Sequence, residues 1–153
     1  MKTVRVLLVA FLLAGSVVVA QKHHRDPMTE QEIEKIRDTS WEPKQRLPLY
    51  VEFVRARLVR LEQVRSDPKT TDRPKLTHDV LDDFQSLYDE LNDNIDTYVD
   101  RHDDIRKPLK GVIEADAEFQ AKLRALKDAA DVPAAEAQQY EFVLNNALET
   151  VDN

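Results

Sequence analysis

The chain has 153 residues and a formal net charge of −7, with 29 acidic residues against 22 Lys and Arg. This acidic balance disfavours binding to nucleic acid and to anionic lipid surfaces. The sequence contains no Cys, which excludes disulfides and thiol chemistry, and only two Gly, which disfavours β folds and glycine loops that hold phosphates.

Residues 1–20 are predicted to be a secretory signal peptide. Lys2 and Arg5 precede an apolar run, and Val18 and Ala20 occupy the positions of a small-residue cleavage site. The apolar stretch is shorter than the about 20 residues of a membrane-spanning helix. We therefore expect cleavage before Gln21, export to the periplasm or beyond, and no stable membrane insertion of the cleaved chain. An uncleaved anchor is the alternative.

A polar leader and one helical domain are predicted after the signal. Residues 21–28 are polar and lack periodicity, so we expect a flexible leader there. Residues 29–153 are predicted to form a single domain. Thr29 and Glu32 have the spacing of a capping box, which predicts a short helix ending near residue 38.

The next predicted helix starts near Pro48 and ends near Arg65, because proline is favoured in a first helical turn. Its apolar residues recur on one broad face, which indicates a core helix: Tyr50, Phe53, Val54, Leu58, Leu61 and Val64. Residues 66–75 contain two prolines among polar residues and are predicted to be a loop.

The longest predicted helix spans residues 77–107, with Thr77 as its N-cap. Apolar or aromatic residues and one histidine follow spacings of three and four, which predicts a packing seam of Leu81, Phe84, Tyr88, Leu91, Ile95, Tyr98, His102 and Ile105. Pro108 predicts a turn or sharp kink after this helix.

Two more helical patterns complete the chain. One runs from residue 109 to about 131, and the last starts after Pro133 and contains Ala137 and Tyr140. No segment shows the alternation of a strand. The predicted fold is therefore all-α: an antiparallel bundle of about four main helices with one short N-terminal helix.

Charge differs between two of the predicted helices. Residues 43–66 carry six cations and two acids, whereas residues 77–107 carry ten acids and three cations. One interpretation is that the two helices are neighbours and that their opposite charges set the pairing. The other is functional: an acidic face would bind cations or a basic partner, and a basic face would bind an anionic one.

A metal site is predicted at the mature N-terminus. After cleavage, the free amine of Gln21 and the imidazole of His23 could bind Cu(II) or Ni(II) in a square plane with two backbone amides, and His24 could add a ligand. Cyclisation of Gln21 would remove the amine. His102, beside Asp103 and Asp104, could be a pH switch or a further ligand, although such a histidine is more often a partly buried, hydrogen-bonded residue at the frayed end of a helix.

No bound cofactor is expected. The segment Leu91-Asn92-Asp93-Asn94 resembles a stretch of the periplasmic haem-b bundle cytochromes. This chain, however, has Tyr88 where that family has its axial methionine, and its last predicted helix contains no histidine. The acidic run of residues 89–104 lacks the glycine of an EF-hand loop.

The predicted function is a non-catalytic binding, accessory or structural role in the cell envelope, with an unknown protein as partner. No catalytic residues are predicted, because no serine, histidine or carboxylate lies in a recognisable catalytic motif. A surface of Ile33, Ile36 and Trp41 is the candidate docking site, unless the short helix is only a brace. The alternatives are copper or nickel handling and a hydrolase that uses the carboxylates of residues 77–107.

Overall fold

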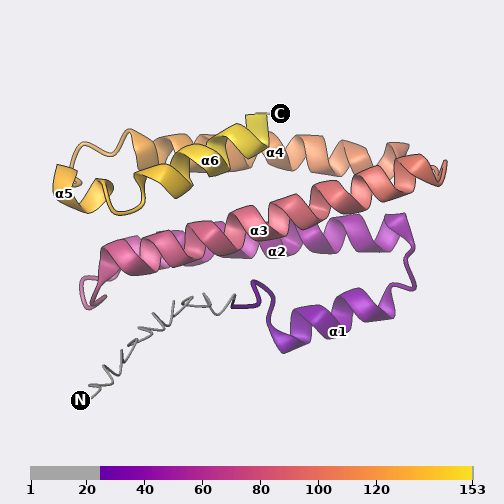
Figure 1. Ribbon diagram of the computed structural model, residues 1–153, viewed down its shortest axis with the longest axis horizontal. Coiled ribbons are helices and arrows are strands. Elements are labelled where there is room, and N and C mark those ends of the chain that lie inside the picture. The colour runs from indigo at the N-terminus through magenta and orange to yellow at the C-terminus, as the bar shows by residue number, and fades with distance from the viewer. Residues whose placement is uncertain (1–24, 153) are drawn as a thin grey trace, which may run out of the picture.

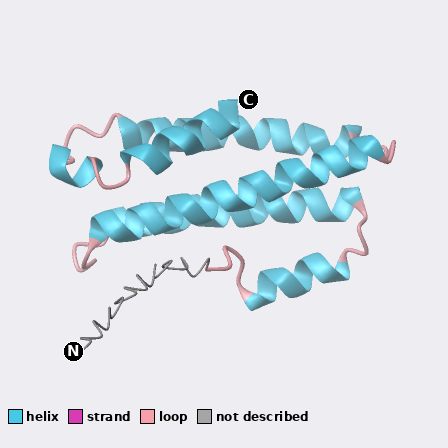
Figure 2. Cartoon of the chain, viewed as in Figure 1, coloured by secondary structure: helices cyan, strands magenta, loops and turns pink. Residues whose placement is uncertain are grey.

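The computed structural model describes residues 25–152, so the predicted signal peptide and its cleavage site lie outside the described residues. The described part contains helices and no strand (Figures 1 and 2), which confirms the all-α prediction. The helices are α1 (Glu30–Asp38), α2 (Pro43–Ser66), α3 (Arg73–Asp100), α4 (Arg106–Lys127), α5 (Ala134–Ala137) and α6 (Glu141–Asp152).

Four helices, α2, α3, α4 and α6, run alternately up and down along the long axis of the molecule (Figure 1). Helix α2 packs against α3 and α4, and helix α6 packs against α3 and α4 from the other side of the bundle. Helix α1 lies on α2. The neighbours α2 and α4 run in the same direction, so their N-termini lie at the same end of the bundle (Figure 1). Within the described range, no helix is both long and apolar enough to cross a bilayer.

The core forms where the predicted apolar faces meet. All six apolar residues predicted on the face of α2 are buried, and so are Leu81, Phe84, Tyr88, Leu91 and Tyr98 of the α3 seam. Phe119 of α4 reaches across the bundle, with its ring centroid 5.9 Å from that of Phe84 and 6.4 Å from that of Tyr88. Both contacts are edge to face, an arrangement that aromatic rings prefer.

The start of α1 confirms the predicted capping box. The Glu32 backbone N–H donates to Thr29 Oγ1 at 3.2 Å, and the Thr29 N–H donates to Glu32 Oε2 at 2.8 Å. Glu32 also forms an ion pair with Arg57 of α2, with Arg57 Nη2 and Glu32 Oε2 2.6 Å apart. Burial raises the pKa of Glu32, but Arg57 and the Thr29 N–H together outweigh burial and leave the pKa below its usual value. This carboxylate both caps α1 and holds it on α2.

The predicted starts of α2 and α3 are wrong by four or five residues. Helix α2 begins at Pro43, because the backbone N–H that proline lacks would have no partner in the first helical turn. Pro48 therefore lies in the interior of this helix. Helix α3 begins at Arg73 with Pro74 in its first turn, so Thr77 is an interior residue and is fully buried. Each helix thus has a proline in its first turn, and the loop between them is shorter than predicted.

The C-terminus of α3 corrects the predicted seam. The helix ends at Asp100, and the next residues form a Schellman motif in which the Asp103 N–H donates to the Tyr98 carbonyl at 2.9 Å and the His102 N–H donates to the Val99 carbonyl at 2.9 Å. His102 therefore has a φ of 60° and an exposed side chain, not a seam position. The chain turns before Pro108, which lies in the first turns of α4.

Replacing His102 with Gly is expected to raise the free energy of unfolding by about 1 kcal/mol, because a side chain in the left-handed conformation costs about 1–2 kcal/mol and glycine avoids this cost. Chemical denaturation measures the change. Asp100→Gly is the control, since Asp100 has helical geometry, and it should lower stability instead. Equal effects of the two substitutions would contradict the assignment of the strained position.

The predicted last helix is broken in two. A single turn, α5, is followed by a separate helix that begins at Glu141, whereas the sequence pattern predicted one helix through Ala137 and Tyr140. Arg65 of α2 holds both sides of this break. It forms an ion pair with Glu136 at 2.8 Å, and its guanidinium carbon lies 5.8 Å from the centroid of the buried Tyr140 ring.

Candidate anion-binding groove

Most arginines of α2 are paired with acids, but not with those of α3. As predicted, α2 and α3 are neighbours, yet the ion pairs connect α2 to other elements: Arg55 with Glu118 of α4 at 3.0 Å, Arg57 with Glu32 of α1 at 2.6 Å, and Arg65 with Glu136 of α5 at 2.8 Å. No direct ion pair joins α2 to α3 in the described residues, so the role of opposite charge in pairing them stays a prediction. Burial raises the pKa of Asp83 on α3, and the charges of Arg25 and Arg57 partly offset this rise. Apolar packing joins α2 to α3, together with hydrogen bonds from Arg46 to Asn94 and from Tyr50 to Glu90, and ion pairs fix the other elements around α2.

Lys44 of α2 and Lys107 of α4 differ from these arginines. Neither lysine side chain forms a hydrogen bond or an ion pair with any residue in the described range. Hydrogen bonds from the side chain and the backbone N–H of Arg106 lower the pKa of Asp104 to about 2. The positive charge of Lys44 makes a smaller contribution to this lowering. The two ammonium groups remain available to a ligand.

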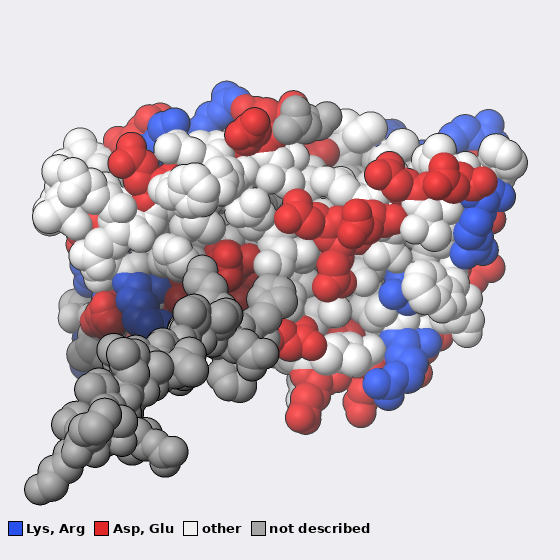
Figure 3. All heavy atoms as spheres, in the orientation of Figure 1, with Lys and Arg blue, Asp and Glu red and all other residues white. Residues whose placement is uncertain are grey.

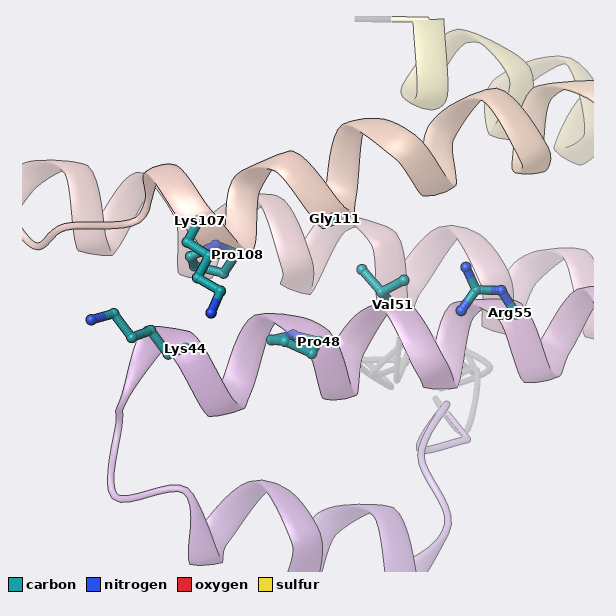
Figure 4. Close-up of a pocket in the computed structure, with 7 residues that line it drawn as sticks. All are labelled: Lys44, Pro48, Val51, Arg55, Lys107, Pro108 and Gly111. Carbon is teal, nitrogen blue, oxygen red and sulfur yellow. The ribbon is translucent and has the colours of Figure 1, made fainter.

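Both lysines line a hollow of about 400 Å³ between α2 and α4 (Figure 4). Its other lining residues are Pro48, Val51 and Arg55 from α2, and Pro108 and Gly111 from α4. In Figure 4 the lysines lie at one end of the hollow and Arg55 at the other, with the apolar residues between them. We call this hollow the α2/α4 groove. Its volume falls within the range of small-molecule sites, about 300–1,000 Å³.

The backbone adds to the positive charge at the lysine end of the groove. The N-termini of α2 and α4 both lie there, and helix N-termini carry a partial positive charge. The first turns of α2 and α4 contain no acid, as is also true of α3, but Glu42 is the N-cap of α2. Asp104, next to this end, is already bound to Arg106 at 2.9 Å. An anion at this end of the groove would therefore meet the ammonium group of Lys107 and two favourable helix dipoles, with the Lys44 ammonium extending outward from the same end (Figure 4).

The predicted docking residues do not form one surface. Ile36 is buried and belongs to the hydrophobic core, and Ile33 is half-buried. Trp41 is 56% exposed, in the turn between α1 and α2, with the guanidinium carbon of Arg46 4.2 Å from its ring centroid. The apolar side of α1 thus packs on the bundle, while Trp41 lies outside it.

The predicted metal ligands Gln21, His23 and His24 lie outside the described residues. Within residues 25–152, no three His, Asp or Glu side chains are grouped in a way that could hold a metal ion. The exposed aspartates of α3 follow one side of the helix at helical spacing: Asp82, Asp89, Asp93, Asp96 and Asp100. Figure 3 shows acidic side chains gathered on this face of the molecule. None of the five lines the α2/α4 groove.

Sequence reasoning named a basic face on residues 43–66 but missed the groove. The sequence signal was a lysine directly beside a proline at the start of each of two helices: Lys44 after Pro43 and Lys107 before Pro108. Only the packing of α2 against α4 brings these turns together. In comparisons with known proteins, no family model, no curated protein and no solved structure gave a significant match to this chain.

Proposed function

We propose that this chain is an exported, non-catalytic binding protein of the cell envelope, periplasmic or secreted, and that it binds an organic anion in the α2/α4 groove. The pattern of residues 1–20 supports export. The observation that carries the binding proposal is the pair Lys44 and Lys107, which come from different helices to one hollow and whose side chains form no hydrogen bond or ion pair in the described part of the chain.

The chemistry of the groove suits binding rather than catalysis. Its polar groups are two lysines and an arginine that is already paired with Glu118, so they can hold a negative charge. Exposed ion pairs contribute about 0.2–1 kcal/mol each, which predicts modest, salt-sensitive affinity. Copper or nickel handling by the N-terminus and hydrolysis by α3 carboxylates stay predictions without a supporting observation.

Calorimetric titration of the purified protein with octanoate tests this proposal. Octanoate should bind, and the neutral octanamide should bind more weakly. The double variant Lys44→Gln/Lys107→Gln should lose about three- to tenfold in affinity, because two exposed charge contacts are removed. Raising the salt concentration should weaken binding to the unmodified protein.

The matched control is Lys69→Gln/Lys110→Gln, which makes the same change in net charge at two lysines outside the groove. This variant should bind octanoate as tightly as the unmodified protein. Equal losses in the two double variants would mean that only the overall charge matters. That result, or the absence of octanoate binding, would overturn the proposal.

A further inference from the structure

We infer that the ligand of the α2/α4 groove is a free single-chain amphiphile, with its anionic head between Lys44 and Lys107 and its hydrocarbon chain along Gly111. This inference rests on the proposed function and specifies the ligand class. Three observations support it: the identity of residue 111, the order of residues along the groove, and the charge of the whole chain.

Gly111 has no explanation within the protein itself. It lies inside α4, where glycine is less favourable than any residue except proline. Its φ is not positive, and a Cβ atom built there would meet nothing within 4 Å. Neither backbone conformation nor internal packing therefore requires glycine here. Because Gly111 has no side chain, the wall of the groove formed by α4 stays open at this position.

The lining changes character along the groove. Beyond the lysine end, the wall consists of Pro48 and Val51 on one side and Pro108 and Gly111 on the other (Figure 4). Arg55 lies at the far end and forms an ion pair with Glu118 at 3.0 Å. A ligand thus meets free positive charge only at one end and apolar surface along the rest, which fits one anionic head followed by a hydrocarbon chain.

The charge of the chain favours a free molecule over a bilayer as the source of this ligand. The net charge of −7 opposes approach to an anionic membrane surface. A dissolved monoanion of small size experiences mainly the local field of the lysine end, since other charges are screened beyond about 8–10 Å at physiological salt. We therefore assign the groove to a dissolved carboxylate or similar single-chain anion.

The test compares hexanoate, octanoate and decanoate by calorimetry, below their micelle concentrations. Each added methylene should strengthen binding about two- to fourfold, the upper value applying to complete burial. Gly111→Leu, which places a side chain on the groove wall, should weaken decanoate binding by at least about tenfold. Gly111→Ala should raise the melting temperature while weakening decanoate binding by a smaller factor.

Ala117→Leu is the matched control, because Ala117 is an exposed position of α4 that does not line the groove. It should leave decanoate binding unchanged. Should affinity depend on the two lysines but neither on chain length nor on Gly111→Leu, this inference is wrong and the proposed function stands. Should the lysine variant bind as tightly as the unmodified protein, the proposed function fails and the inference fails with it. Tight binding only to anionic lipid vesicles would also overturn the inference.

Discussion

Phe119→Ala is expected to lower the free energy of unfolding by about 3–5 kcal/mol, the usual cost of removing a buried phenylalanine. Phe119 is fully buried, and its ring contacts Phe84 and Tyr88 edge to face. These contacts join α4 to α3 across the centre of the bundle. The substitution removes apolar burial and two aromatic contacts, and it leaves a cavity where the helices converge. Because small domains have a total stability of about 5–15 kcal/mol, this loss should be easily measured.

Urea denaturation followed by far-ultraviolet circular dichroism measures this change. Phe142→Ala is the matched control, since the Phe142 side chain on α6 is 79% exposed. The control should change stability by less than about 0.5 kcal/mol. A small effect of Phe119→Ala, comparable with that of the control, would show that α4 does not contribute its aromatic side chain to the core in solution.

Arg46→Ala is expected to lower the free energy of unfolding by about 2–4 kcal/mol. The Arg46 side chain is buried, and its guanidinium donates to Asn94 Oδ1 of α3 at 2.9 Å and to the Ile36 carbonyl of α1 at 3.2 Å. Hydrogen bonds from charged groups contribute about 1.5–3 kcal/mol each, and acceptors left buried without a donor add to the loss. The Trp41 ring would also lose the cation that it contacts.

Two measurements separate this local effect from a general loss of charge. Arg60→Ala is the control, because Arg60 is an exposed arginine on the same helix, and it should cost less than about 0.5 kcal/mol. Fluorescence of Trp41, the only tryptophan, should report a change in the turn between α1 and α2 in Arg46→Ala before global unfolding. Equal stability of the two variants would mean that Arg46 does not hold α1 and α3 together.

The positions of the core residues could be predicted from the sequence because helical periodicity is a local property. The seam from Leu81 to Tyr98 predicts which side chains are buried, and the structure confirms this for all of them except Ile95, which is half-buried. The capping box of Thr29 and Glu32 is equally local, since both partners lie within one helical turn. For such features, the spacing of residue types along the chain contains the necessary information.

The ends of helices were harder to predict because residues compete for the same role. Thr77 is a good capping residue, but the helix starts earlier with Pro74 in its first turn, and tertiary packing buries the threonine. His102 continues the spacing of the seam, yet the turn that brings α4 back requires a left-handed residue there. In both cases, contacts between distant parts of the chain outweighed the preference predicted from the local pattern.

The sequence by itself determined the helical class of this protein, the faces that form its core and the lack of thiol chemistry, because composition and periodicity depend on no distant contact. Tertiary structure alone decided the partners of the arginines on α2 and the existence of the α2/α4 groove. Lys44 and Lys107 are 63 positions apart in the chain. They share one hollow only because α2 and α4 pack as parallel neighbours, with both N-termini at the same end of the bundle.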